Sequence, residues 1–192
     1  MLGVILCGGQ STRMGDDKGL LLFRNKTWAQ IAKEKLSPLS TEVLLSVNSN
    51  QFEKYRLVFK NEELVDDNTE LDIAGPLLGL LSVHLKFPKE NLLVLACDML
   101  DMQTFVLEQL IHKYVSDKHF EAIAFTSHGQ VEPLCAVYSA NGLSRIYSAY
   151  QNKSLTKHSM MHVLEILDTD FIPAPESWNP YFKNFNLPAD LP

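Results

Sequence analysis

The sequence predicts a single α/β domain in which a mostly parallel sheet lies between two layers of helices. Short apolar segments alternate along the chain with segments whose apolar residues recur at helical spacing. The first apolar segment, residues 2–7, is continuously apolar, which is typical of a strand covered on both faces of a parallel sheet. Polar and glycine-rich residues follow the predicted strands, where α/β proteins bind their ligands. Together these observations indicate repeated strand–helix–strand units.

The strands are expected where short apolar runs end in turn-forming residues. The first run, residues 2–7, ends at Gly8 and Gly9, and residues 91–96 (NLLVLA) form the most strand-like run of the chain. The other strands are expected at residues 42–47, at either 57–58 or 64–65, at 121–125 and at 134–138.

Helices are expected where apolar residues recur every three or four positions. The segment 27–36 has this spacing and is followed by Pro38, and the segment 77–85 follows Pro76, which suits the first turn of a helix. Further helices are expected at residues 104–114 and 141–150. The segment 173–192 is rich in proline and asparagine and is expected to be an extended tail packed on the domain.

Length and composition are those of one globular domain. The chain has 192 residues, of which 46% are hydrophobic and 21% charged, which argues against intrinsic disorder. Seventeen Lys and Arg against 23 Asp and Glu give a net charge of −6. Because nucleic acids and anionic membranes bind to basic surfaces, neither is an expected partner, although a local basic pocket for a small anion is compatible with this charge.

The cysteines and the apolar segments indicate a cytoplasmic protein. Cys7, Cys97 and Cys135 are widely spaced, form no C-x-x-C pair and lie among apolar residues, so we expect buried thiols in a reducing compartment. The apolar opening is too short for a signal peptide, and no later segment approaches the roughly 20 apolar residues of a membrane span.

The segment 6–18 (LCGGQSTRMGDDK) is the strongest chemical signal in the sequence. Gly8 and Gly9 follow a buried strand, so the backbone can turn sharply there and approach a ligand closely. Successive backbone N–H groups in such a turn can bind phosphate oxygens, and Arg13 and Lys18 add positive charge. The segment matches neither G-x-G-x-x-G nor the Walker pattern, and a surface loop with incidental charges is the alternative interpretation.

Two acidic residues follow predicted strands. Asp98 comes directly after the apolar run 91–96, where one carboxylate, together with phosphate oxygens and water, could hold Mg²⁺. Asp98 could instead cap the helix that is expected to begin near Gln103. Asp67 is a weaker candidate, because an acidic pair after a strand is commonly a turn.

The pattern L-x-G-G-x-S-x-R-M-G-x-D-K of residues 6–18 resembles the signature loop of the nucleotidyltransferases, in particular the molybdenum cofactor guanylyltransferases. The resemblance covers nearly the whole chain, and its further motifs occur in the family's order. They are Asn48, Asp67, the GPLLG of residues 75–79, Cys97-Asp98 and the NFNLPADL of residues 184–191.

The resemblance implies a fold, a reaction and its substrates. The implied fold is a single Rossmann-like nucleotidyltransferase domain over residues 1–192, with a nucleotide-binding half at about 1–100 and an acceptor-binding half at about 101–192. The implied enzyme transfers GMP from GTP to molybdenum-molybdopterin, uses Mg²⁺ and releases pyrophosphate. The resemblance also implies transient contact with other proteins that handle the molybdenum cofactor.

The resemblance further assigns roles to individual residues. Catalytic roles fall on Arg13, Lys18 and Asp98, of which Asp98 binds the metal. The implied nucleotide-binding residues are Leu6, Cys7, Gly8, Gly9, Lys18, Asn48, Asp67 and Asp98, and the implied acceptor-binding residues are Gly79, Asn184 and Asn186.

Two positions depart from the family pattern. Glu132 stands where a histidine is usual, near the expected acceptor side, and an ionised carboxylate there would repel an anionic pterin phosphate. Leu100 stands where proline is frequent. The pair Gly8-Gly9 resembles guanylyl rather than cytidylyl transferases, which usually read A-A-G. Cytidylyl transfer to molybdopterin, transfer to a sugar phosphate and a non-catalytic nucleotide-binding accessory protein are the alternatives.

Overall fold

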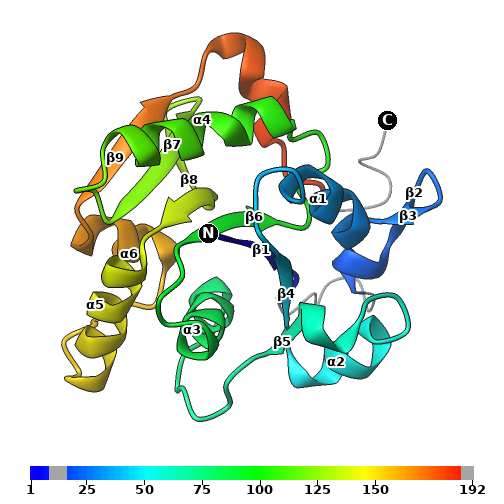
Figure 1. Cartoon of the computed structure of the whole chain (residues 1–192), viewed down its shortest axis with the longest axis horizontal. Helices are drawn as coiled ribbons and strands as arrows, with labels where there is room; N and C mark the ends of the chain where they lie inside the picture. The colour runs from blue at the N-terminus through cyan, green and yellow to red at the C-terminus, as the bar shows by residue number, and fades with distance from the viewer. Residues whose placement is uncertain (9–16, 187–192) are drawn as a thin grey trace.

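The computed structural model describes residues 1–8 and 17–186, which form an α/β domain around one seven-stranded sheet (Figure 1). The order of the strands across the sheet is β5-β4-β1-β6-β8-β7-β9. These strands are β1 (Leu2–Leu6), β4 (Val43–Val47), β5 (Leu64–Asp66), β6 (Leu92–Ala96), β7 (Ala122–Ser127), β8 (Gln130–Tyr138) and β9 (Thr169–Pro173). A small hairpin of β2 (Leu22–Phe23) and β3 (Lys26–Thr27) lies apart from this sheet.

Six of the seven strands run in the same direction. The pairs β1–β4, β1–β6, β4–β5 and β7–β9 are parallel, whereas β8 is antiparallel to both of its neighbours. The reversal follows from the two-residue turn between β7 and β8, where His128 and Gly129 have φ values of 51° and 72°. A two-residue turn with positive φ at both positions joins antiparallel strands of a hairpin. The predicted mostly parallel sheet is therefore confirmed.

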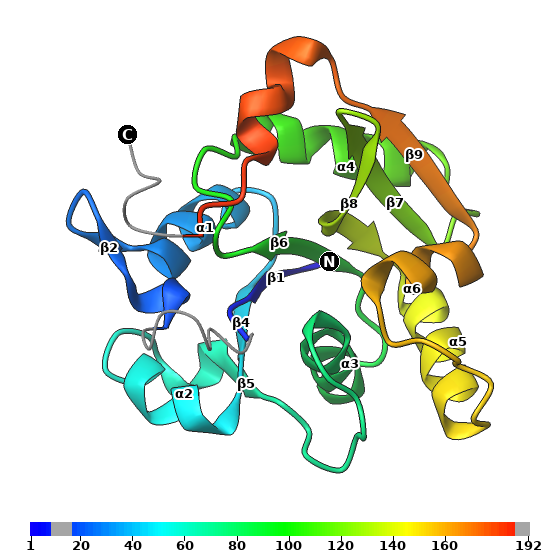
Figure 2. The ribbon, with the colours of Figure 1, turned by 180° about the vertical axis from the view of Figure 1, so that it is seen from behind.

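Helices cover both faces of the sheet (Figure 2). The helices are α1 (Trp28–Leu36), α2 (Ser49–Tyr55), α3 (Pro76–Lys86), α4 (Thr104–Ser116), α5 (Ala140–Gln151) and α6 (Met160–Ile166), with 3₁₀ turns η1 (Lys18–Leu20), η2 (Asn61–Glu63) and η3 (Glu176–Phe182). One buried cluster packs α1, α2 and α4 against the sheet, and a second packs α3, α5 and α6 against the opposite face. Alternate residues of β1 supply the two cores, because successive strand residues point to opposite faces.

Several local expectations need correction. The third strand is Leu64–Asp66, whereas the alternative at residues 57–58 is wrong: Leu57 is 87% exposed in the turn after α2. The sequence reading missed α2, α6 and β9. The described part of the predicted tail, residues 173–186, packs on the domain as expected, but it contains the 3₁₀ turn η3 and is not extended throughout.

None of the helices in the described ranges is long and apolar enough to cross a membrane.

Candidate active site

Three side chains from distant parts of the chain meet at the carboxyl edge of the sheet. The Lys18 Nζ lies 3.3 Å from Oδ2 of Asp98 and donates a hydrogen bond of 2.8 Å to Oδ1 of Asn186. The side chains of Lys18 and Asp98 are only 23% and 20% exposed, so water screens this ion pair less than it screens an ion pair on the open surface. The structure thus brings together one predicted residue from each of three motifs.

Hydrogen bonds of the preceding residue, Asp17, fix the 3₁₀ turn η1 that carries Lys18. Asp17 caps η1: its Oδ1 accepts hydrogen bonds from the Gly19 N–H at 3.1 Å and from the Tyr55 hydroxyl at 2.9 Å. The position of Gly19 requires a glycine, because a Cβ there would lie 2.0 Å from the Tyr55 hydroxyl oxygen. Sequence reasoning missed Tyr55 because it missed α2, the helix that carries this residue.

Asp98 lies in the turn directly after β6 and is held by the segment after η3. The Phe185 N–H donates a 3.0 Å hydrogen bond to the Asp98 carbonyl, so the end of the described chain is tied to this turn. The capping alternative is excluded, since α4 begins at Thr104 with Gln103 as its N-cap. Burial raises the pKa of Asp98, and the nearby Lys18 ammonium opposes that shift.

The chemistry of Asp98 fits a magnesium ion that is shared with phosphates. Mg²⁺ prefers oxygen ligands and is usually held by one or two carboxylates, with phosphates and water completing its shell. Within the described residues no group of three or more His, Cys, Asp or Glu side chains could hold a metal by itself. A single, mostly buried carboxylate at the carboxyl edge of the sheet therefore suits a metal that arrives with a phosphate-bearing ligand.

Asp67 lies at the end of β5, close to the glycine turn. Its Oδ1 accepts a 3.4 Å hydrogen bond from the Ser46 hydroxyl, and a Cβ on Gly8 would lie 3.7 Å from its Oδ2. The pKa of Asp67 is raised to about 6, mainly by burial. The hydrogen bond from Ser46 lowers this pKa, and the negative charge of Asp66 raises it. Gly8 and Asp67, predicted from separate motifs, are thus neighbours.

Asn48 has a structural role that the motif alone did not reveal. Its Oδ1 accepts hydrogen bonds from the Asn50 and Gln51 N–H groups, and the Gln51 Oε1 accepts from the Asn48 N–H, which is a capping box. Gln51 also donates through Nε2 to the Cys7 carbonyl at 3.1 Å. The spacing Asn48-x-x-Gln51 is the signal that could have predicted α2.

The backbone of the predicted nucleotide-binding residues Leu6 and Cys7 is already hydrogen bonded. The Leu6 carbonyl accepts from the Cys97 N–H at 3.3 Å, and the Cys7 N–H donates to the Ser46 carbonyl at 3.0 Å. Gly8 follows them and is half-exposed. Gly9 and Arg13 lie outside the described residues.

The predicted acceptor residues lie in different environments. Gly79 is buried in α3, where a Cβ would lie 2.3 Å from the Ser46 Oγ, so this glycine lets α3 approach β4 closely. Asn184 and Asn186 are exposed on either side of the buried Phe185. Asn186 contacts Lys18, and the acceptor roles of all three predicted residues stay predictions.

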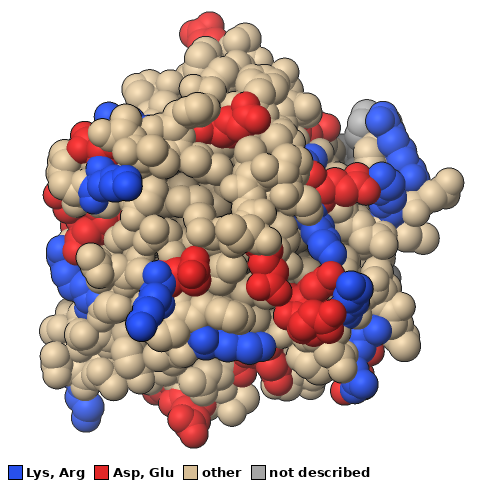
Figure 3. All heavy atoms as spheres, in the orientation of Figure 1, with Lys and Arg blue, Asp and Glu red and all other residues tan. Residues whose placement is uncertain are grey.

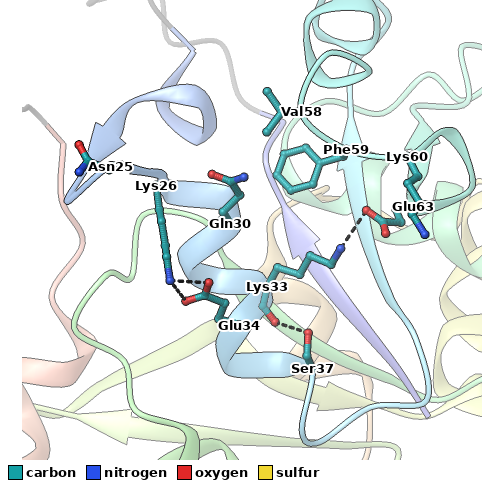
Figure 4. A pocket seen from close by; sticks show the side chains of 10 residues that line it. All are labelled: Asn25, Lys26, Gln30, Lys33, Glu34, Ser37, Val58, Phe59, Lys60 and Glu63. Atoms are coloured by element: carbon teal, nitrogen blue, oxygen red, sulfur yellow. Dashed lines mark hydrogen bonds and ion pairs between the residues drawn. The ribbon is translucent and has the colours of Figure 1, made fainter.

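A cavity of about 430 Å³ lies elsewhere, between α1 and the segment that follows α2 (Figure 4). None of the predicted site residues lines it. Its three lysines are paired with acids: Lys33 with Glu63 at 2.9 Å, Lys26 with Glu34 at 2.6 Å and Lys60 with Glu62 at 4.0 Å. Because these charges are compensated, the cavity is a poor candidate for binding an anionic substrate.

Charged side chains of both signs are interspersed on the face of the molecule shown in Figure 3. That face has no broad basic patch, in keeping with the net charge of −6.

The fold and the comparisons define the protein as a nucleotidyltransferase. A family model described as the MobA-like NTP transferase domain matches residues 3–166, and the chain belongs to that family. It is 30% identical over 187 residues to a probable molybdenum cofactor guanylyltransferase of Flavobacterium johnsoniae, covering 97% of this chain and 92% of the relative. A protein of the same name from a Geobacillus species is 29% identical over 198 residues, covering 100% of this chain and 96% of the relative.

Among solved structures, the molybdopterin-guanine dinucleotide biosynthesis protein A of Archaeoglobus fulgidus superposes with a TM-score of 0.75 at 23% identity. The match covers 99% of this chain and 94% of that one, and it shows a shared fold. The predicted Rossmann-like nucleotidyltransferase fold is thereby confirmed.

Proposed function

We propose that the protein transfers GMP from GTP to the terminal phosphate of molybdenum-molybdopterin and releases pyrophosphate. The observation that carries the proposal is the contact of Lys18 with both Asp98 and Asn186. These two residues lie 80 and 168 positions after Lys18 in the sequence. A cation, a carboxylate suited to Mg²⁺ and an amide at one sheet edge are what a bound triphosphate and its acceptor need. The names of the relatives supply the identity of nucleotide and acceptor.

The chemistry asks little of the protein beyond alignment and charge. The phosphate of the acceptor is itself a competent nucleophile, so no side-chain nucleophile is required. Catalysis can come from holding the two phosphates in line for attack and from neutralising the charge that develops on pyrophosphate. Lys18 and Arg13 would supply positive charge for this purpose.

Asp98 would hold Mg²⁺ together with the phosphates of the nucleotide. When bound, the metal supplies charge neutralisation and a template for the phosphates. In the free protein the ion pair with Lys18 compensates the Asp98 carboxylate. Lys18 would supply positive charge for the phosphates of the nucleotide.

The nucleotide would be bound over the ends of β1, β4 and β5. In this proposal the backbone of Leu6, Cys7, Gly8 and Gly9 contacts the nucleotide. Asp67 and Asn48 provide hydrogen-bond partners for the nucleoside. The side-chain nitrogen Nδ2 of Asn48 makes no hydrogen bond within the described part of the chain.

The acceptor would be bound by the second half of the chain. We assign residues 1–100 mainly to the nucleotide and residues 101–192 mainly to the acceptor. Asn184 and Asn186 lie in the second half, and Gly79 is the one residue of the first half assigned to the acceptor side. The product then passes to other proteins that handle the molybdenum cofactor by transient contact.

The test is to incubate the protein with each nucleoside triphosphate, Mg²⁺ and molybdenum cofactor, and to identify the dinucleotide by mass. The proposal expects the guanine dinucleotide as the main product, with GTP preferred over CTP by at least about tenfold in kcat/KM, because a mismatched base leaves buried polar groups unpaired. A cytosine dinucleotide as the main product would overturn the choice of base. Turnover only with a sugar phosphate would overturn the choice of acceptor.

A further inference from the structure

The turn that carries Asp98 is held by hydrogen-bond donors that are remote in sequence. The carbonyls of three consecutive residues accept such hydrogen bonds, beginning with Asp98, whose carbonyl accepts from the Phe185 N–H at 3.0 Å. The Met99 and Leu100 carbonyls both accept from the Lys35 ammonium, which lies 3.3 Å from the Met99 oxygen. The backbone of this turn therefore depends on contacts that its own segment does not supply.

Lys35 lies in the last turn of α1 and joins that helix to the segment between β6 and α4. While its Nζ bonds to the turn after β6, its own carbonyl accepts a 3.3 Å hydrogen bond from the Thr104 hydroxyl at the start of α4. Trp28, at the start of α1, packs with Leu100 and Phe185. Both ends of α1 therefore contact the connection between β6 and α4.

The Lys35 ammonium is partly withdrawn from water for these contacts. The residue is half-buried, and within the described ranges its ammonium donates hydrogen bonds to these two carbonyls alone. The pKa of Lys35 is lowered to about 8, mainly by burial, although the Asp101 carboxylate opposes the shift. A partly dehydrated ammonium costs free energy, and an apolar side chain of similar length would fill the same space without that cost. The role of this charge is therefore to be sought in the two carbonyls that it holds.

We propose that Lys35 is a positioning residue of the metal site: by fixing the two carbonyls after Asp98, its ammonium holds the Asp98 carboxylate where it can bind Mg²⁺ together with the nucleotide. The inference rests on the proposed function, because it takes Asp98 as the metal ligand. Lys35 acts through the backbone of the turn and not by contact with the substrate. A carboxylate that is already in place loses little conformational freedom when the metal binds, so a fixed turn favours tighter metal binding.

The binding test uses three variants of α1. Lys35→Met keeps the length of the side chain and removes its donors, whereas Lys35→Arg keeps the charge and the donors. Lys33→Met is the matched control, because Lys33 lies on the same helix and pairs with Glu63. The Kd for GTP is measured for each protein with Mg²⁺ and in EDTA, and the ratio of the two Kd values gives the coupling between metal and nucleotide.

Lys35→Met should lose coupling and keep nucleotide affinity. Its Kd for GTP in EDTA should stay within about twofold of the wild-type value, while the tightening of GTP binding by Mg²⁺ should shrink at least about tenfold. Lys35→Arg should keep most of the tightening and Lys33→Met all of it. A merely structural role of Lys35 would weaken both affinities alike and leave their ratio unchanged, and that result would overturn the proposal. An equal loss of coupling in Lys35→Arg and Lys35→Met would also overturn it.

Amide hydrogen exchange tests the turn without any ligand. The Met99 N–H donates to the Ala96 carbonyl at 3.3 Å, and the Met102 N–H donates to the Met99 carbonyl at 3.2 Å. Both amides should exchange at least about tenfold faster in Lys35→Met than in the wild type, whereas the amides of β4 should keep their wild-type rates. Unchanged exchange at both amides would overturn the proposal. If the wild-type protein binds no GTP or forms no guanine dinucleotide, the proposed function fails, and the exchange rates still decide whether Lys35 holds the turn.

Discussion

Two carboxyl groups, Asp67 and Asp98, are held partly out of water at the ligand edge of the sheet. Burial is the largest influence on both, and it raises the pKa of each above its ordinary value. Lys18 compensates Asp98, whereas Asp67 has the Ser46 hydroxyl as a weaker partner. The protein alone therefore stabilises negative charge here incompletely, and a bound cation or hydrogen-bond donor would complete the site.

Asp67→Asn should stabilise the free protein in a pH-dependent way. The pKa of Asp67 is raised from 3.8 to about 6, so the native state binds more protons than the unfolded state between these values. The contribution of this group to stability is largest below about pH 4 and falls as the pH rises toward 6. The variant should unfold like the wild type below pH 4 and at a higher temperature above pH 6. The measurement is Tm by calorimetry from pH 3.5 to 7.5, and equal melting curves throughout would contradict it.

Lys18→Ala should lower kcat/KM for GTP at least about tenfold, equivalent to roughly 1.4 kcal/mol, because a fixed positive charge is removed from the phosphates. The melting temperature should change little. Lys26→Ala removes a different lysine that is also paired with a carboxylate, Glu34, and serves as the control, with wild-type turnover expected. Unchanged turnover of Lys18→Ala would remove Lys18 from the site.

Asp98→Asn tests the proposed metal ligand. Asparagine keeps the size of the side chain and removes the charge that Mg²⁺ requires, so turnover should collapse at every Mg²⁺ concentration while Tm stays at or above the wild-type value. The measurement is the steady-state rate of Asp98→Asn and of the wild type across a Mg²⁺ titration, together with the Tm of both proteins. A large loss of Tm with activity preserved would make Asp98 a structural residue.

At the scale of elements, the site depends on how closely α3 approaches β4. Gly79 is a point of close approach, since a Cβ there would overlap the Ser46 Oγ at 2.3 Å. Ser46 in turn donates a hydrogen bond to Asp67. The packing of one helix against one strand thus positions a predicted nucleotide-binding residue.

Gly79→Ala should destabilise the protein by about 1–3 kcal/mol, because the added methyl group forces α3 and β4 apart. Ser46→Gly removes the atoms that the methyl group would meet, so the two changes together should cost less than the sum of their separate effects. Urea unfolding of the four proteins measures this interaction energy. Strictly additive costs would show that the contact between Gly79 and Ser46 is not the cause.

In the molecule as a whole, the last described segment brings Asn186 to Lys18, near the other end of the described chain. Phe185 is 1% exposed and packs with Trp28 at the start of α1 and with Leu100 after β6. Both ribbon views show the segment after η3 running down beside α1. Since Asn186 follows directly, the packing of Phe185 brings an amide from the far end of the sequence to Lys18.

Phe185→Ala should cost about 3–5 kcal/mol of stability through the cavity it leaves. It should also lower turnover at temperatures where the variant is fully folded, because Asn186 and the Asp98 turn lose their anchor. Phe185→Leu removes less volume, so its stability and its turnover should both lie between those of Phe185→Ala and the wild type. Wild-type turnover by folded Phe185→Ala would show that the Asp98 turn is held by β6 alone.

Local sequence patterns were sufficient to predict the α/β class, most strands of the sheet, and the positions of Lys18 and Asp98 in the segments that follow β1 and β6. These features are local: continuous apolar runs specify buried strands, and the residues that follow such strands must lie at one edge of a parallel sheet. The missed elements α2, α6 and β9 are short, with five to seven residues each, and such lengths carry little periodicity.

Which residues from distant segments meet depends on the tertiary fold. The close approach of α3 to β4 accounts for Gly79, and the burial of Phe185 sets Asn186 against Lys18. Each of these contacts joins segments that are distant in the sequence. Whether such segments meet depends on the order of the strands in the sheet and on how the helices pack against it. Local sequence patterns encode neither, because a pattern within one element is the same whatever that element packs against.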